Sequence, residues 1–197
     1  MKNYALEMDK VVASLGGRRP RLLLQSCCGP CSTAVLEVLR PHFEVTLLYY
    51  NPNIQPEEEY RLRLENQLRV LRELYPDVGL LECAYDGGAF TAAARGLESD
   101  PEGGARCTAC FRLRLEYTAR AAAGGGFEFF CTTLSVSPHK DAERLNAIGA
   151  GLGEKYGVRF LPCDFKKRDG YRRSIELSKS LGLYRQNYCG CLYSKSV

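Results

Sequence analysis

The sequence predicts an α/β protein built on a Rossmann-like parallel sheet with helices on both faces. Short apolar segments of strand length alternate with longer segments of helical periodicity, an order typical of parallel sheets. Chemically distinctive residues directly follow these apolar segments, where open α/β sheets bind their ligands. The chain has 197 residues, within the roughly 100–200 residues of one domain, so we expect a single domain over residues 1–197.

Three strands and two helices are expected in the first half of the chain. The apolar run 21–26 leads into Cys27-Cys28-Gly29-Pro30-Cys31, and a helix follows with Ser32 or Thr33 near its start. A second strand over 43–50 ends at Asn51-Pro52-Asn53, and a third covers 78–84. Between them, Pro56 and the acidic run 57–59 suit a helix N-terminus, which predicts a long helix to residue 74.

Two more strands and three helices are expected in the second half. Helices are predicted over 112–123, 141–156 and 170–181, and strands over 127–131 and 158–161. Four of the five strands are followed by distinctive residues: Cys27 to Cys31, Asn51 to Asn53, Thr132 to Lys140, and Cys163 with Asp164. Because the carboxyl ends of parallel strands meet at one edge of the sheet, we expect these loops to form one site.

The composition is that of a soluble globular protein, with 45% hydrophobic and 25% charged residues. No apolar run approaches the roughly 18 residues of a membrane span. The segment from Met1 to Lys10 lacks the apolar core of a signal peptide. We therefore expect no membrane association and a cytoplasmic location.

Ten cysteines are the unusual feature of this chain. They make up about 5% of the residues, below the roughly 8–10% of disulfide scaffolds. Clustered cysteines in a reducing compartment indicate metal or redox chemistry more often than structural disulfides. Seven of the ten lie in short motifs: Cys27, Cys28 and Cys31; Cys107 and Cys110; and Cys189 and Cys191.

This cysteine pattern predicts a metal site at the carboxyl ends of the strands. A single C-x2-C pair is equally compatible with a thioredoxin-like disulfide, but two pairs and a C-x-C together indicate metal. Zinc is the first alternative, since structural zinc sites use such pairs. However, 75 residues separate the two pairs, and seven cysteines exceed the four that one zinc ion takes. The number and type of ligands favour an iron–sulfur centre.

Adjacent cysteines raise the question of how many metal centres there are. Neighbouring side chains of an extended segment point to opposite sides, so we expect Cys27 and Cys28 not to hold the same metal atom. Either one of them is structural, or two metal centres lie side by side. The isolated residues Cys83, Cys131 and Cys163 are expected to be small buried hydrophobic residues.

The charge distribution suits a polyanionic partner, although a solvated basic surface explains it equally well. Residues 1–98 carry 11 basic and 13 acidic residues, whereas residues 99–197 carry 16 and 10. The loop after the fifth strand contains Lys166, Lys167 and Arg168, which are placed to meet phosphate. Several tyrosines are suited to stacking on an unpaired base, but packing is the simpler explanation for most of them.

Taken in order, these motifs resemble those of the QueH-type epoxyqueuosine reductase family. The resemblance covers about residues 21–194 and is carried by Cys27-Cys28-Gly29-Pro30-Cys31-Ser32, Asn51-Pro52-Asn53-Ile54, Arg106-Cys107-Thr108-Ala109-Cys110-Phe111, the segment from Thr132 to Pro138, Asp164-Phe165-Lys166-Lys167, and the segment from Tyr184 to Cys191. It implies a fold akin to nucleotide-binding tRNA-modifying domains. The implied reaction reduces the epoxide of epoxyqueuosine to the alkene of queuosine at wobble position 34 of tRNAs with a GUN anticodon.

The resemblance also implies cofactors and roles. The cofactors are a [4Fe–4S] cluster and an additional mononuclear iron, without cobalamin, with electrons from a separate and unidentified donor. We expect Cys28, Cys107 and Cys110 to hold the cluster and Cys27 and Cys31 to hold the second iron. Cys189 and Cys191 are expected to be further ligands or a dithiol close to the substrate. Asp164, followed by His139, is the expected proton donor, and tRNA would be held by Lys140, Lys166, Lys167 and Arg168.

Two other functions remain open at this point. A tRNA sulfur-transfer enzyme would end the first strand in an ATP-binding loop rich in Gly and Ser with an Asp, which the segment Cys27 to Cys31 does not resemble. A zinc-stabilised RNA-binding domain would use the same cysteines without catalysis. Metal analysis separates the reductase from the binding domain, because acid-labile sulfide accompanies only an iron–sulfur centre.

Overall fold

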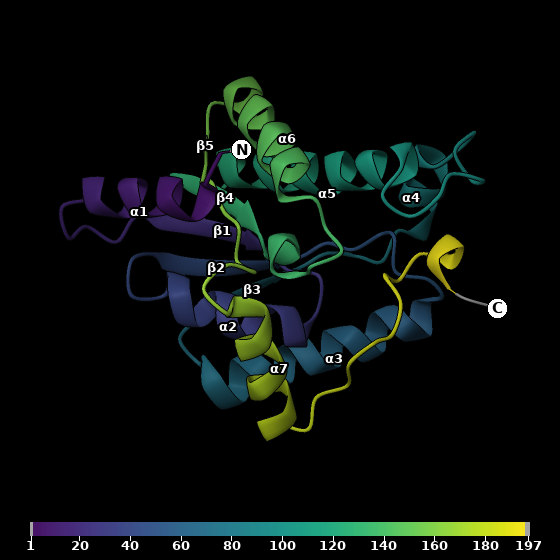
Figure 1. Cartoon of the computed structure of the whole chain (residues 1–197), viewed down its shortest axis with the longest axis horizontal. Coiled ribbons are helices and arrows are strands. Elements are labelled where there is room, and N and C mark those ends of the chain that lie inside the picture. Colours follow the sequence, from purple (N-terminus) through teal and green to yellow (C-terminus); the bar gives the residue numbers. More distant parts are fainter. Residues whose placement is uncertain (1, 196–197) are drawn as a thin grey trace.

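The computed structural model describes residues 2–195 and contains one sheet of five parallel strands (Figure 1). The strands are β1 (Arg21–Gln25), β2 (Glu44–Tyr49), β3 (Gly79–Glu82), β4 (Phe129–Thr132) and β5 (Arg159–Phe160). Their order across the sheet is β3-β2-β1-β4-β5, and every neighbouring pair is parallel. The predicted α/β fold with a parallel sheet is confirmed.

Helices cover both faces of this sheet. They are α1 (Tyr4–Ser14), α2 (Gly29–Leu39), α3 (Glu57–Leu74), α4 (Gly87–Ala93), α5 (Ala105–Gly124), α6 (Ala142–Tyr156) and α7 (Gly170–Ser180), with 3-10 turns at Thr133–Val136 and Leu192–Ser194. In Figure 1, α2, α3 and α7 lie below the sheet, whereas α4, α5 and α6 lie above it. The central strand β1 is therefore covered on both sides.

Alternation along β1 divides the core into two parts. Leu22 and Leu24 pack with apolar side chains of α2 and α3, while Leu23 points to the opposite face and packs with α5 and α6. All three leucine side chains are fully buried. This explains why the strand reads as a continuous apolar run in the sequence.

The start of α5 differs from the sequence prediction. The helix begins at Ala105, so Cys107 and Cys110 lie in its first two turns and do not precede it. The Asp100 carboxylate accepts a hydrogen bond from the Arg106 backbone N–H at 3.1 Å, which satisfies one of the free N–H groups of the first turn. The Arg106 side chain donates to the carbonyls of Leu97, Glu98 and Asp100. This cap comes from outside the helix, and local sequence patterns do not reveal it.

The helices α1 and α4 were not expected. Only Ala5 and Met8 of α1 are buried, so the helix has a narrow apolar stripe. Helix α4 opens with two glycines, which disfavour a helix in sequence terms, but the Asp86 carboxylate caps it through the Ala89 N–H at 3.1 Å. Over residues 2–195, none of the helices combines the length and the apolar character that crossing a membrane requires.

Helices α2 and α3 approach closely at Gly29, the first residue of α2. A Cβ atom at this position would lie 2.6 Å from the backbone oxygen of Asn66 on α3. Only glycine allows this approach without a shift of one helix. The approach fixes where α2 begins, and therefore where Cys28 and Cys31 lie.

We expect Gly29→Ala to lower the free energy of unfolding by about 1–3 kcal/mol, because the added methyl group overlaps the α3 backbone. Gly151→Ala on α6 is the matched control. Its Cβ would have no neighbour within 4 Å, and alanine should stabilise the helix by about 0.5–1 kcal/mol. Urea unfolding followed by circular dichroism measures both changes. Equal stability of wild type and Gly29→Ala would contradict the tight approach.

Candidate metal centre

The strongest candidate site lies in the turn between β1 and α2. The chain bends at Cys27 after β1 ends, and α2 starts two residues later with Pro30 in its first turn, where the missing N–H costs nothing. Cys28 is the N-cap residue, but its side chain makes no capping hydrogen bond. Its thiol is therefore directed toward the other two cysteines and not to the helix backbone.

The Cys27, Cys28 and Cys31 thiols form a compact group, here called the thiol triad. Their three Sγ atoms lie within 4.8 Å of one another, and those of Cys27 and Cys28 are 3.7 Å apart. The prediction that Cys27 and Cys28 point to opposite sides is wrong, because the chain bends at Cys27, although Cys28 itself is extended. Three thiols at this spacing can ligate one metal centre.

Each thiol of the triad changes the acidity of the others. Hydrogen bonds from Cys28 and Cys31 hold the pKa of the Cys27 thiol well below its ordinary value. These hydrogen bonds have the opposite effect on the pKa of the thiols that donate them. The bond with Cys27 raises the pKa of Cys28 to about 12. Cys27 is therefore the first of the three to become a thiolate, the form in which cysteine binds a metal.

A buried polar network holds this turn against the neighbouring strands. The Gln25 amide donates to the Tyr50 carbonyl and to Asn51 Oδ1, and its own oxygen accepts from Thr132 Oγ1 at 2.8 Å. Asn51 Nδ2 donates to the Ser26 carbonyl at 2.8 Å. Thr133 Oγ1 receives the backbone N–H of Cys27 at 3.2 Å. The ends of β1, β2 and β4 are thus bonded to each other and to the triad.

Arg114 of α5 approaches the same place from the opposite side of the sheet. It is buried, and its Nη2 donates to Asn51 Oδ1 at 2.6 Å. Its positive charge helps to lower the pKa of Cys27. Burial raises the pKa of Cys110 to about 12, and the Arg114 charge partly opposes this. The charge of the guanidinium therefore acts on both the triad and Cys110.

The other motif cysteines lie near the triad but outside its ligand distance. Within residues 2–195, the triad is the one group of three or more Cys, His, Asp or Glu ligand atoms that close together. Cys110 is buried in a small cluster with Cys191, Phe90 and Ala94. Cys107 Sγ accepts the Gly103 N–H at 3.2 Å. The structure therefore joins Cys110 to Cys191 and does not join Cys28 directly to Cys107 and Cys110.

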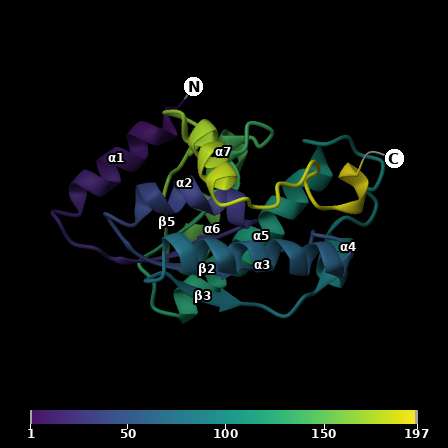
Figure 2. The same ribbon diagram turned by 90° about the horizontal axis from the view of Figure 1, so that it is seen from below.

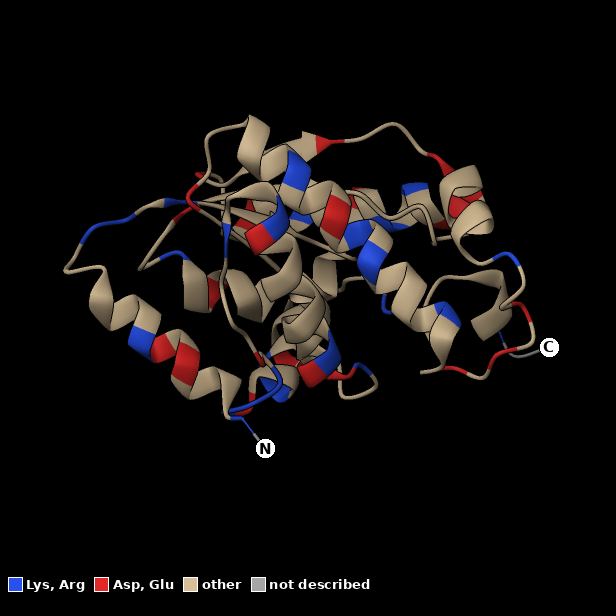
Figure 3. Ribbon diagram, turned by 90° about the horizontal axis from the view of Figure 1, so that it is seen from above, with Lys and Arg blue, Asp and Glu red and all other residues tan. Residues whose placement is uncertain are grey.

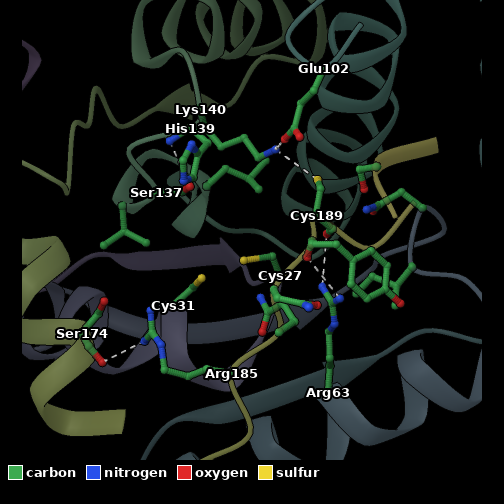
Figure 4. A pocket seen from close by; sticks show the side chains of 18 of the residues that line it. Cys27, Cys31, Arg63, Glu102, Ser137, His139, Lys140, Ser174, Arg185 and Cys189 are labelled. Carbon is green, nitrogen blue, oxygen red and sulfur yellow. Dashed lines mark hydrogen bonds and ion pairs between the residues drawn. The ribbon is translucent and has the colours of Figure 1, made fainter. Parts of the chain in front are cut away.

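A pocket of about 480 Å³ opens at this edge of the sheet (Figure 4). Cys27 and Cys31 form part of its base, and the loop after β4 contributes Ser137, His139 and Lys140. The C-terminal segment supplies the remaining wall, including Arg185, Gln186 and Cys189. Three of the four loops that were predicted to form one site, those after β1, β2 and β4, line this pocket, as the parallel sheet requires.

Lys140 reaches across the pocket wall to Cys189. Its Nζ lies 3.0 Å from Cys189 Sγ and 3.1 Å from a carboxylate oxygen of Glu102 (Figure 4). Burial favours the neutral amine, but Cys189 and Glu102 outweigh it and raise the pKa of Lys140 above its ordinary value. Lys140 was expected on the tRNA backbone, yet it is 9% exposed and is already engaged inside the pocket.

Helix α3 holds the C-terminal segment in place. Arg63 pairs with Glu59 at 2.7 Å and donates to the carbonyls of Cys189 and Tyr188. Gln186 Nε2 then lies 3.3 Å from Cys28 Sγ. Figure 2 shows this segment, in yellow, running from α7 along α3 toward α4. Sequence reasoning missed Arg63, although a charged residue on the buried face of a helix, between Tyr60 and Gln67, is the signal that could have found it.

Asp164, Lys167 and Arg168 lie apart from the pocket of the triad. Asp164, Lys167 and Arg168 line a second cavity, which α1, α2 and α7 surround. Asp164 pairs with Lys166 at 3.0 Å, and Arg168 pairs with Asp9 of α1 at 2.6 Å. Of the two predicted proton donors, His139 lines the pocket and Asp164 does not.

The isolated cysteines lie largely as expected. Cys131, on β4, and Cys163, after β5, are fully buried in the core, and Cys83 is half-buried. Burial raises the pKa of all three thiols. They are therefore neutral packing side chains in this structure.

The fold and the site define an α/β protein with a Rossmann-like parallel sheet and, at the carboxyl end of its central strand, three thiols close enough to hold a metal ion. The family model "Epoxyqueuosine reductase QueH" matches residues 22–197. Proteins named epoxyqueuosine reductase QueH are similar over nearly the whole chain. The one from Staphylococcus epidermidis is 39% identical over 98% of this chain and 87% of its own, and the one from Streptococcus pyogenes is 41% identical over 99% and 80%. This chain belongs to the epoxyqueuosine reductase QueH family.

One solved structure confirms the fold. The U34-tRNA thiolase NcsA from Methanococcus maripaludis, solved with its [4Fe–4S] cluster, superposes with a TM-score of 0.57. The match covers 98% of this chain and 69% of the thiolase, at 14% sequence identity. The two proteins share an architecture although little of the sequence is common.

We expect Cys28→Ala to abolish metal binding at the triad, because it removes one of three clustered ligands. Cys83→Ala is the control, since that thiol lies outside the group. Iron, zinc and acid-labile sulfide are measured per chain after anaerobic purification. Unchanged metal content in Cys28→Ala would show that the triad is not the site.

Proposed function

We propose that this chain is an epoxyqueuosine reductase that converts epoxyqueuosine in tRNA to queuosine. The reaction consumes two electrons and two protons, breaks both C–O bonds of the epoxide and yields an alkene and water. The observation that carries the proposal is the thiol triad at the base of an open pocket, in a chain of the QueH family. Curated relatives with the same name cover nearly the whole chain.

The donor set fits an iron–sulfur centre. The triad offers only soft sulfur ligands, which suit iron–sulfur clusters, and the buried Arg114 supplies a positive charge beside them. We propose that the triad holds the [4Fe–4S] cluster and the additional mononuclear iron together with Cys107 and Cys110. When bound, these centres supply electrons singly, from a separate donor, and an electron-accepting site for the epoxide oxygen.

Residues of the pocket wall are placed to move protons. His139 is the proposed proton donor to the departing oxygen, because it lines the pocket whereas Asp164 lies in the second cavity. Lys140 keeps its charge and orients Cys189 through the 3.0 Å contact. Cys189 and Cys191 are therefore proposed as a dithiol beside the substrate, with Cys189 facing the pocket and Cys191 buried.

The substrate enters as a single nucleoside of the anticodon loop. A wobble base is already unpaired, so it reaches a recessed pocket without the cost of opening a duplex. We propose tRNAs with a GUN anticodon as substrates, which places the reaction in the cytoplasm. Figure 3 shows Lys and Arg interspersed with Asp and Glu along the helices and loops, so we propose that a few exposed cations, and not a broad basic face, contact the tRNA backbone.

The residue best suited to a phosphate contact is Lys167. Among the predicted tRNA-binding residues, Lys140 is buried and Lys166 donates to the Lys140 carbonyl at 3.3 Å. Arg168 is bound to Asp9. Lys167 is exposed and has no ion pair among the described residues.

The reaction is tested by anaerobic incubation of the iron-loaded chain with tRNA that contains epoxyqueuosine and a chemical reductant. We expect nucleoside mass spectrometry to show the loss of one oxygen atom. Cys28→Ala should lose this activity, and Cys83→Ala should keep it. A fully loaded chain that leaves the nucleoside unchanged refutes the reductase assignment. Stoichiometric zinc without sulfide would favour an RNA-binding domain.

Binding of tRNA is tested separately with Lys167→Ala. We expect a weaker complex and a slope of log affinity against log salt that is smaller by about 0.7–0.9, the change for one lost phosphate contact. Lys155→Ala is the control, since Lys155 lies on α6 and pairs with Glu116. If Lys167→Ala and the control bind tRNA with the same affinity and slope as wild type, the loop after β5 is not at the interface.

A further inference from the structure

Arg114 is a buried cation without a protein counter-ion. Its side chain is 2% exposed, and the one oxygen atom of residues 2–195 to which it donates is the neutral amide oxygen of Asn51. Its Nε atom is buried and has no hydrogen-bond partner in the part of the chain that the structure describes. No carboxylate of residues 2–195 lies within ion-pair distance of it. A buried charge in this state is costly unless an anion lies beside it.

The other buried arginines show which partners this chain provides for a buried guanidinium. Arg63 pairs with the Glu59 carboxylate at 2.7 Å and donates to two carbonyls. Arg106 donates to three backbone carbonyls of the segment 97–100. Arg114 has neither arrangement, although it is equally buried. Because Arg114 also lines the pocket, we expect its negatively charged partner to lie there.

Two thiols lie within the influence of the Arg114 charge. One is Cys27 of the triad, which lines the same pocket, and the other is Cys110 of its own helix, one turn away. Cysteine binds a metal as the thiolate, so each ligand adds a negative charge to the centre. An iron centre with several thiolate ligands is an anion, and reduction by one electron makes it more negative.

We infer that Arg114 is the counter-ion of the iron centre proposed at the triad and that it raises the reduction potential of that centre. The inference rests on the proposed function, because it requires iron at the triad. A fixed positive charge in a site shielded from water stabilises the reduced form, which carries one more negative charge, more than the oxidised form. Arg114 thus acts through the metal and is a positioning residue, not a catalytic one.

The test is the midpoint potential of the reconstituted chain, measured by anaerobic titration with a chemical reductant and followed by electron paramagnetic resonance. We expect Arg114→Gln to shift the potential to a more negative value, whereas Arg114→Lys, which keeps the charge, stays close to wild type. Arg120→Gln is the matched control: it removes the same charge from an exposed position of α5, where water screens it, and should not move the potential.

A second variant leaves the guanidinium in place. Asn51→Asp gives Arg114 a carboxylate at the position that now accepts its hydrogen bond, at the loss of the bond from Asn51 Nδ2 to Ser26. The potential should again become more negative. Wild-type potentials in both Arg114→Gln and Asn51→Asp, at full iron and sulfide content, overturn the inference. If the folded variants Arg114→Gln and Arg114→Lys both lose the cluster, the inference is also overturned. Lysine keeps the positive charge, so that result would show that Arg114 supplies something other than charge.

These results are separable from failure of the proposed function. A wild-type chain that takes up no iron and sulfide disproves the iron centre itself. A loaded wild-type chain with an unchanged potential in the variants disproves only the role of Arg114.

Discussion

The side-chain amide of Gln25 connects the carboxyl ends of three strands, and the site depends on this connection. It is fully buried at the end of β1, donates to the end of β2 and accepts from Thr132 at the end of β4. A buried amide that lost these partners would cost about 1–3 kcal/mol for each unsatisfied group, so the register of the three strands is strongly specified. The next residues of the chain form the thiol triad. The positions of the thiols thus follow from the hydrogen bonds of the sheet edge.

The remainder of the pocket comes from segments that are distant in sequence. Arg63 and Glu59 bind the C-terminal segment to α3, and Lys140 contacts that segment from the other side through Cys189. The C-terminal segment therefore forms one wall of the pocket as an irregular chain, held by these side chains and by the hydrogen bond from the Gln55 N–H to the Gly190 carbonyl at 2.9 Å. Its glycine, Gly190, has a positive φ of 121°, a conformation that allows the tight turn between Cys189 and Cys191.

The sheet could be predicted from the sequence because its strands are short, apolar and separated by clear helical patterns. The convergence of the loops followed from the parallel topology, and the cysteine motifs identified the edge where the chemistry lies. The relation of Cys27 to Cys28 could not be predicted, since it depends on a bend at one residue. Arg114 could not be singled out from the sequence either. It belongs to no motif, and only the structure shows that no carboxylate of the described residues pairs with it. Lys140 was expected to contact the tRNA backbone, and only the fold reveals Cys189 and Glu102 beside it.

The close contact of Gly29 with the α3 backbone bears on whether the protein keeps its fold when a metal centre is lost. The start of α2 is fixed by helix packing and by hydrogen bonds between protein groups, so metal–ligand bonds are not what gives the turn its shape. Small domains that fold around zinc collapse when the ion leaves. In this chain the scaffold should keep its form without the iron–sulfur centre proposed for it. Centres of iron and sulfide are readily destroyed by oxygen, and a scaffold that keeps its form can be repaired by reloading, without synthesis of a new chain.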